Sequence, residues 1–128
     1  MVLDASIAID WLLDLPRARF ILTKAGHVRL FAAPHLLDAE VGQVLRRFVW
    51  SGKLRKSRAE MALADLQHLP VRRYEHAPLL RRAWQLRDNC TFYDALYLAL
   101  AESLSVSLLT GDAALNKVQG LKQKVIVI

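Results

Sequence analysis

Short apolar segments alternate with longer segments along the whole chain, and this alternation restricts the fold more than any other feature. The short segments favour strands and cover residues 1–4, 28–33, 71–74, 106–110 and 124–128. The longer segments favour helices and cover residues 6–14, 17–25, 34–51, 57–68, a stretch from about Pro78, the stretch after Thr91 and a short one from Asp112. Apolar strands separated by helices are typical of a parallel sheet covered on both faces. The sequence therefore predicts a three-layer α/β fold with a mostly parallel central sheet.

Two of the expected helices begin with a local capping signal. Ser57 and Glu60 have the S-x-x-E spacing of a capping box, in which a serine hydroxyl and a glutamate carboxylate each satisfy a free backbone amide. Thr91 stands directly before the apolar helix FYDALYLALAE. We therefore expect Ser57 and Thr91 to be the N-cap residues of their helices.

The length and composition suit one basic domain. A chain of 128 residues can bury about two thirds of the surface that its unfolded form exposes, so residues 1–128 are expected to form a single domain. No apolar run approaches the roughly 20 uncharged residues that cross a bilayer, and the N-terminal segment lacks the basic start of a signal peptide. A cytoplasmic location is expected. The net charge of +6 favours an acidic partner such as nucleic acid, although solubility alone could explain it.

Two acidic residues follow expected strands directly. Asp4 comes after the apolar residues Val2 and Leu3, and Asp112 follows the strand that ends in Thr110. Ligands of open parallel sheets bind beyond the carboxyl ends of the strands, so these two acids can meet at one edge. Each of them could instead simply cap the helix that it precedes, because aspartate is a favoured N-cap residue.

Two further acids lie in helices. Asp94 stands in the first turn of a helix that is apolar all round and is therefore expected to be buried. The helix dipole alone gives such an acid less than about 1 kcal/mol, which does not explain a carboxylate against a core. Glu40 borders the apolar stripe of the helix over residues 34–51. Asp38 borders the opposite edge of the same stripe, and periodicity does not choose between them.

Four buried carboxylates require compensating positive charge, because an unpaired ionised group in a core costs several kcal/mol. A divalent cation would supply that charge, and oxygen ligands suit Mg²⁺ or Mn²⁺ better than zinc. The four histidines include no H-x₃-H or H-E-x-x-H pair, so a histidine zinc site is not expected. The acids therefore indicate a site for a hard divalent metal.

Four ordered motifs make the interpretation specific: VLDASIAI, LLDAEVGQVLRR, TFYDALYLALAE and LLTGD. In this order they closely resemble the PIN-domain ribonucleases, and most nearly the VapC-like toxins of bacterial and archaeal toxin–antitoxin pairs. The resemblance covers the whole chain. It implies metal-binding, catalytic carboxylates at Asp4, Glu40, Asp94 and Asp112, and so selects Glu40 over Asp38. It also implies hydroxyl support from Ser6 and Thr110.

The same resemblance implies an activity and partners. A VapC-like protein would be a Mg²⁺- or Mn²⁺-dependent endoribonuclease that hydrolyses RNA phosphodiester bonds. It would form a homodimer and be held inactive by a VapB-like antitoxin whose C-terminal segment lies across the active site. Exposed apolar residues such as Trp11 and Leu12 would offer a groove for that segment, although the chain's own core could equally take them.

A basic stretch is a candidate RNA contact. Six cations surround Trp50, namely Arg46, Arg47, Lys53, Arg55, Lys56 and Arg58. They could steer an RNA backbone while the indole ring stacks on a base, or they could form a solvated helix end in which the aromatic ring anchors a partner or core.

Two other functions compete with the toxin. A housekeeping PIN nuclease that processes RNA, or a PIN domain that only binds it, would carry the same motifs. A phospho-accepting receiver domain has a similar length and also carries acids at its strand ends. Receiver domains usually present adjacent acids after the first strand, whereas here Asp4 is followed by Ala5 and Ser6.

Overall fold

The computed structural model describes residues 1–27 and 30–128 and has a five-stranded sheet in the order β3-β2-β1-β4-β5. The strands are β1 Val2–Leu3, β2 Phe31–Pro34, β3 Val71–Tyr74, β4 Leu108–Thr110 and β5 Val125–Val127. All four pairings are parallel, so the predicted α/β fold is confirmed. The first two residues of the strand predicted over 28–33 lie outside the described residues.

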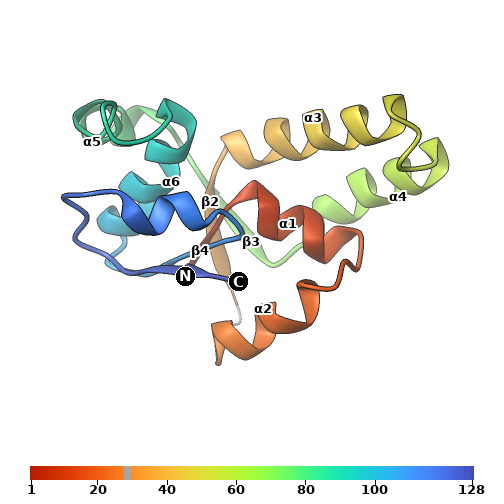
Figure 1. Ribbon diagram of the computed structural model, residues 1–128, viewed down its shortest axis with the longest axis horizontal. Helices are drawn as coiled ribbons and strands as arrows, with labels where there is room; N and C mark the ends of the chain where they lie inside the picture. The colour runs from red at the N-terminus through yellow and green to blue at the C-terminus, as the bar shows by residue number, and fades with distance from the viewer. Residues whose placement is uncertain (28–29) are drawn as a thin grey trace.

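Helices cover both faces of the sheet. They are α1 Ala5–Leu12, α2 Ala18–Ala25, α3 Leu36–Trp50, α4 Lys56–Leu66, α5 Leu80–Gln85 and α6 Phe92–Ser103, with short 3-10 turns η1 Ala77–Leu79 and η2 Ala113–Lys117. Helices α1 to α4 pack against one another on one side, and α5 packs on α6 on the other (Figure 1). None of the helices in residues 1–27 and 30–128 is long and apolar enough to cross a membrane.

The centre of the core is formed by β1, β4 and α6. Val2, Leu3, Leu108 and Leu109 are fully buried, and α6 is buried from Ala95 to Ala101. The prediction of a buried apolar helix is therefore confirmed. Full burial of each such aliphatic side chain contributes roughly 1.5–3 kcal/mol, which keeps the two central strands in place although they are short.

Two helix starts differ from the predictions. Helix α4 begins at Lys56 and not at Ser57, so the predicted capping box is wrong. The backbone amides of Lys53 and Leu54 both bond to the carbonyl of Phe48, which completes the turn between α3 and α4 one residue earlier and leaves Ser57 inside the helix. Pro34 ends β2 instead of beginning α3, because it pairs in register with Tyr74 of β3. Thr91 caps α6 as expected, accepting a hydrogen bond from the Asp94 amide.

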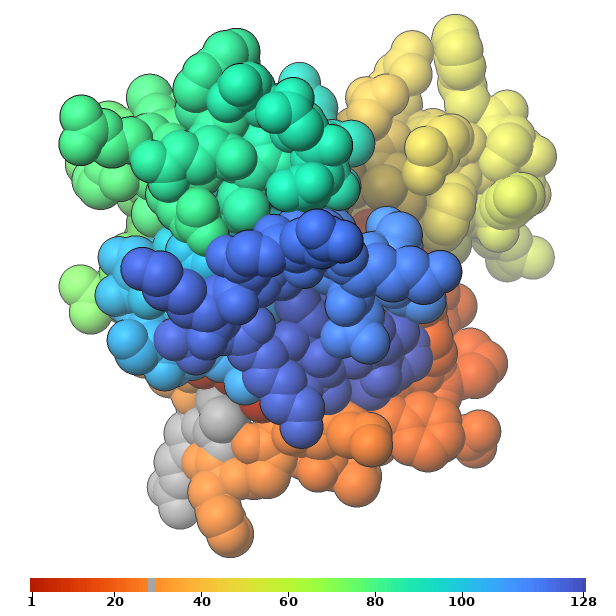
Figure 2. Space-filling model, turned by 60° about the vertical axis from the view of Figure 1, so that its left-hand side comes forward, coloured from red at the N-terminus to blue at the C-terminus, as the bar shows by residue number. Residues whose placement is uncertain are grey.

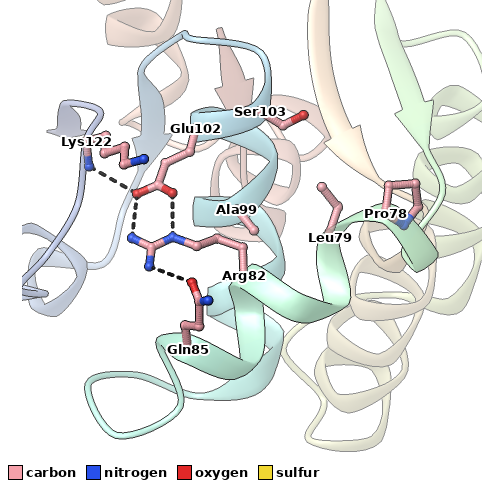
Figure 3. A pocket seen from close by; sticks show the side chains of 8 residues that line it. All are labelled: Pro78, Leu79, Arg82, Gln85, Ala99, Glu102, Ser103 and Lys122. Atoms are coloured by element: carbon pink, nitrogen blue, oxygen red, sulfur yellow. Dashed lines mark hydrogen bonds and ion pairs between the residues drawn. The ribbon is translucent and has the colours of Figure 1, made fainter.

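An ion pair between α5 and α6 also holds the C-terminal segment, through hydrogen bonds to its backbone. Arg82 Nε lies 2.6 Å from Glu102 Oε2, and Arg82 Nη2 lies 3.0 Å from Oε1 (Figure 3). The Lys122 amide also donates to Oε1, and Arg82 donates to the Gly120 carbonyl at 2.8 Å. Figure 2 shows the C-terminal segment, in blue, packed below the green region around α5. Glu102 therefore joins α5, α6 and the segment before β5.

Replacing Glu102 by Gln should lower the stability of the protein at neutral pH and leave it unchanged in strong acid. Arg82 and the Lys122 amide lower the pKa of Glu102 below its ordinary value of 4.5. The stabilisation by the carboxylate is therefore present above pH 4.5 and is lost as pH falls through the lowered pKa, as linkage requires for a depressed acid. We expect a loss of about 2 kcal/mol at pH 7 in urea unfolding.

The matched control for this prediction is Glu60→Gln. Glu60 forms an exposed pair with Lys56 at 3.7 Å, and exposed pairs contribute about 0.5 kcal/mol. Equal losses in the two variants at pH 7 would contradict the role assigned to Glu102.

Candidate active site

Asp4 lies at the carboxyl end of β1 and is held by three donors. The Ser6 hydroxyl donates to Asp4 Oδ1 at 2.6 Å, the Ile7 amide donates to the same oxygen at 3.1 Å, and the Thr110 hydroxyl donates to Oδ2. The Asp4 side chain is also the N-cap of α1, so the capping role that the sequence left open is confirmed. Burial raises the pKa of Asp4, and the hydroxyl and amide donors only oppose that rise. A nearby cation would therefore stabilise the ionised form of the Asp4 carboxylate.

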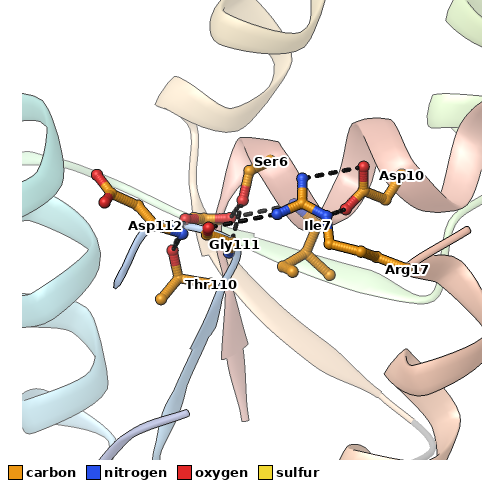
Figure 4. A network of polar contacts seen from close by, with 8 residues as sticks. Ser6, Ile7, Asp10, Arg17, Thr110, Gly111 and Asp112 are labelled. Carbon is orange, nitrogen blue, oxygen red and sulfur yellow. Dashed lines mark hydrogen bonds and ion pairs between the residues drawn. The ribbon is translucent and has the colours of Figure 1, made fainter. Parts of the chain in front are cut away.

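Hydroxyl groups connect the exits of β1 and β4. Ser6 Oγ accepts from the Gly111 amide at 2.9 Å, and Thr110 Oγ1 accepts from the Asp112 amide at 2.9 Å (Figure 4). The Asp112 side chain caps η2 through the Ala114 amide at 2.8 Å. Asp4 and Asp112 thus lie at one edge of the sheet, linked through Thr110, while each also caps its own helix.

An ion pair that the sequence analysis missed supports this edge. Arg17 Nε lies 2.7 Å from Asp10 Oδ2, in ion-pair contact but without hydrogen-bond geometry, and Nη2 donates to Oδ1 at 3.2 Å. Arg17 Nη1 also donates to the Gly111 carbonyl at 3.3 Å. A Cβ on Gly111 would lie 2.2 Å from that nitrogen and 3.0 Å from Ser6 Oγ. A side chain at position 111 would therefore displace the Arg17 guanidinium from its place beside the Gly111 carbonyl.

Glu40 is bound by a buried tyrosine from another helix. The Tyr97 hydroxyl donates to Glu40 Oε2 at 2.6 Å. Burial raises the pKa of Glu40, and the nearby charges of Asp94 and Asp4 raise it further. The hydrogen bond from Tyr97 lowers this pKa and so opposes the rise. Burial and the Glu40 carboxylate likewise raise the pKa of Tyr97. One sequence feature indicates that Tyr97 belongs to the site. It follows Asp94 by three residues, so the two side chains lie on the same side of α6.

Asp38 has a different environment from Glu40. Its carboxylate pairs with Arg73 of β3, with Oδ1 2.9 Å from Nη2 and both oxygens 3.3 Å from Nε. Arg73 also donates to the carbonyls of Val71 and Leu66, so the guanidinium is fixed by the local backbone. The structure thus separates the two acids that periodicity left equivalent, since Asp38 is paired with Arg73 and Glu40 forms no ion pair within residues 1–27 and 30–128.

Asp94 lies half-buried in the first turn of α6. The Thr91 hydroxyl donates to Asp94 Oδ2 at 2.6 Å, and the Asp94 amide donates to the oxygen of the same hydroxyl at 3.1 Å. The carboxylate is close enough to raise the pKa values of both Glu40 and Tyr97. Asp94 therefore belongs to the same electrostatic cluster as Glu40.

The four acids share an edge of the fold but do not enclose one position. Asp4, Glu40 and Asp94 interact electrostatically, and Asp112 is tied to Asp4 through Thr110. In the part of the chain that the structure describes, no three Asp, Glu, His or Cys side chains are arranged closely enough to hold a metal ion. Each carboxylate is instead bonded to a hydroxyl group or a backbone amide. Asp4 is buried, Glu40 and Asp94 are half-buried and Asp112 is exposed, so the expected burial of all four acids is wrong for Asp112. Their carboxylate oxygens are the kind of ligand that a hard divalent cation prefers.

The other predicted surface residues have mixed outcomes. Leu12 is buried and Trp11 packs edge-on against Phe31 with ring centres 5.6 Å apart, so these two residues do not form an exposed groove. Trp50 is 81% exposed, and the Arg46 guanidinium covers its ring at 4.4 Å. Arg58 donates to the Leu12 carbonyl and therefore helps to hold α4 on α1.

The fold and the site together define an α/β protein with an acidic cluster beyond the carboxyl ends of its central parallel strands. The chain belongs to the PIN domain family, whose model matches residues 1–121. Ribonuclease VapC1 of Mycobacterium tuberculosis (strain CDC 1551 / Oshkosh) is 46% identical over 121 residues, which are 94% of this chain and 91% of that protein.

Two solved structures show the same fold. PAE2754 from Pyrobaculum aerophilum has 26% identity and a TM-score of 0.69, covering 97% of this chain and 81% of that one. VapBC2 from Rickettsia felis, bound to a DNA fragment from their promoter, has 15% identity and a TM-score of 0.69, covering 97% and 96%. The predicted family is thereby confirmed.

Proposed function

We propose that this chain is a metal-dependent endoribonuclease of the VapC type, a toxin that hydrolyses RNA phosphodiester bonds. The observation that carries the proposal is the position of the four acids: Asp4 and Asp112 lie at the exits of β1 and β4 and are linked through Thr110, and Glu40 is bonded to Tyr97 of α6, the helix that also carries Asp94. The similarity to ribonuclease VapC1 supports RNA as the substrate. Residues 1–128 would act as one PIN domain.

We propose that Asp4, Glu40, Asp94 and Asp112 hold Mg²⁺ or Mn²⁺. Bound there, the ion would lower the pKa of a water molecule and balance the charge of the phosphate. The carboxylates fit this task in number and chemistry, because Mg²⁺ binds a few carboxylates and keeps several waters. The hydroxyl groups that now bond to them, from Ser6, Thr91, Tyr97 and Thr110, would then serve to orient the acids.

The protein residues contribute mainly positioning. Ser6 and Thr110 fix both oxygens of Asp4, and Tyr97 fixes one oxygen of Glu40. Hydrogen bonds from neighbouring side chains to metal ligands fix the orientation of those ligands, and their loss typically costs about 10- to 100-fold in metal affinity or activity. The buried helix α6 provides the rigid support, since it carries both Asp94 and Tyr97.

A VapB-like antitoxin and a second copy of the chain are proposed as partners. The relatives named VapC and the structural likeness to VapBC2 support the antitoxin. A cytoplasmic location follows from the same proposal, because the RNA and the antitoxin would have to be present in that compartment. A housekeeping RNA-processing nuclease would use the same acids without an antitoxin.

Expression of the chain in a bacterial host, with and without a co-expressed VapB-like antitoxin, should separate these functions. We expect growth arrest and a few defined RNA cuts with the chain alone, and neither when a cognate antitoxin is present. Mapping of RNA 5′ ends is the measurement. The purified chain should make the same cuts with Mg²⁺ or Mn²⁺ and lose them in EDTA. Arrest without RNA cleavage would rule out the nuclease.

A further inference from the structure

A cavity of about 400 Å³ adjoins the candidate active site between α3 and the start of α6. Its polar lining comes from Glu40, Gln43, Arg47 and Tyr93, and Ala39 and Val44 contribute apolar wall. In Figure 2 the surface is hollowed between the green region around α5 and the yellow end of α3. Cavities of about 300–1,000 Å³ are typical of small-molecule sites, so this one can hold a group the size of a nucleobase.

Three of these side chains carry polar groups that a ligand in the cavity could bind. Gln43, Arg47 and the Tyr93 hydroxyl form no hydrogen bond or ion pair with side chains or backbone in residues 1–27 and 30–128. Tyr93 lies in the exposed first turn of α6 and is itself 61% exposed, whereas the helix is buried from Ala95 to Ala101. Exposed aromatic rings stack on unpaired bases, an amide can read a base edge, and a guanidinium binds phosphate. The chemistry of the cavity is that of a nucleotide subsite.

We propose that this cavity binds one unpaired RNA base next to the cleaved phosphodiester, with the base stacked on Tyr93 and a flanking phosphate on Arg47. This inference rests on the proposed ribonuclease function. Glu40 lies both in the cavity wall and in the acidic cluster, so a nucleotide in the cavity is continuous with a phosphate at the acids. Bases in duplex RNA are stacked and inaccessible, so the subsite would select single-stranded RNA or loops.

A peptide suits this cavity less well than a nucleotide. A bound amphipathic helix requires apolar anchors over two or more turns. Such a surface exists elsewhere, between α3 and α4, where Val49, Trp50 and Leu63 line a second cavity of about 340 Å³. The cavity beside Glu40 combines an apolar wall with an amide, a cation and one exposed ring, which matches the mixed polarity of a nucleotide.

The test is binding of metal-free protein to a fluorescein-labelled single-stranded RNA, measured by anisotropy, together with kcat and KM for its cleavage in Mg²⁺. Tyr93→Ala should weaken binding about 5- to 150-fold, the range for loss of one stacked base, and raise KM with kcat kept. Tyr93→Phe should bind like the parent because it keeps the ring. Arg47→Ala should weaken binding and reduce the salt slope by about one.

Trp84→Ala is the matched control, because Trp84 is as exposed as Tyr93, at 61%, but lies on α5 outside the cavity. Its binding should equal that of the parent. Normal cleavage with unchanged binding by Tyr93→Ala, or weaker binding by Trp84→Ala alone, would overturn the subsite and leave the nuclease function standing. A parent protein that neither binds nor cleaves RNA would overturn both. Loss of antitoxin binding by Tyr93→Ala without loss of RNA binding would assign the cavity to a peptide.

Discussion

Replacing Asp4 by Asn is expected to reduce RNA cleavage at least about 100-fold, the lower limit for removing one electrostatic group from a preorganised site. Asp4 is the most buried of the four acids, at 8% exposure, and lies between donors from α1 and β4. An amide cannot supply the negative charge that binds a divalent cation. The Asp4→Asn/Asp94→Asn double variant should be inactive in the assay that maps RNA ends.

The fold of the Asp4→Asn variant should survive. Asparagine keeps one carbonyl oxygen, which can accept from Ser6 and the Ile7 amide, and it removes a buried charge. The Thr110 hydroxyl loses its acceptor, which costs about 1 kcal/mol. Circular dichroism and urea unfolding should therefore show a folded protein of slightly changed stability.

Asp14→Asn is the matched control for this experiment. Asp14 belongs to the same N-terminal segment, is exposed, and has a φ of 53°, a conformation that asparagine adopts as readily as aspartate. The control changes the same charge with no effect expected on cleavage. Full activity of the Asp4→Asn/Asp94→Asn double variant would refute the proposed role of the acids.

The sheet was predictable because its determinants are local. Successive residues of a strand point to opposite faces of the sheet. Val2 and Leu3 are both apolar, as are Leu108 and Leu109, so both faces of the sheet must be covered. Helix boundaries were less predictable, as Ser57 shows. Its S-x-x-E spacing satisfied the sequence rule, but the start of α4 is determined by the turn that the Phe48 carbonyl closes.

The acidic cluster was only partly predictable, because its members interact through residues from other elements. The helix stripe placed Asp38 and Glu40 symmetrically, and the difference between them lies in Arg73 of β3 and Tyr97 of α6. Strand ends correctly indicated that Asp4 and Asp112 share an edge. Local patterns do not show that Thr110 joins them across 106 residues of sequence.

The contact among Asp10, Arg17 and Gly111 illustrates the limit most clearly. Arg17 and Gly111 are separated by 94 residues, and neither is part of a periodic pattern that would indicate a contact. The one available signal was Asp10 itself, an acid inside the apolar segment IAIDWLL. A buried acid requires a cation, but the sequence does not specify which one.

Replacing Arg17 by Ala should destabilise the protein by about 2 kcal/mol, because it leaves a buried carboxylate without its cation. The Asp10 side chain is 3% exposed and the Arg17 side chain 42% exposed. Breaking a fully buried pair costs about 3–5 kcal/mol, and solvent around the guanidinium reduces that value. The bond from Arg17 to the Gly111 carbonyl is lost as well, so the turn that carries Thr110 and Asp112 should loosen and cleavage should fall.

A double-mutant cycle separates the ion pair from other effects of the substitution. In the Asp10→Asn background the buried charge is already absent, so Arg17→Ala should cost about 1 kcal/mol less than in the parent. Arg19→Ala is the control, since the Arg19 guanidinium covers the exposed ring of Phe20 at 4.9 Å and forms no ion pair in the part of the chain that the structure describes. If Arg17→Ala and Arg19→Ala change the urea midpoint equally, Arg17 does not support the β4 turn. A larger loss in Arg17→Ala that shrinks by about 1 kcal/mol with Asp10→Asn means that the ion pair between Arg17 and Asp10 of α1 stabilises the sheet edge at which Asp4 and Asp112 lie.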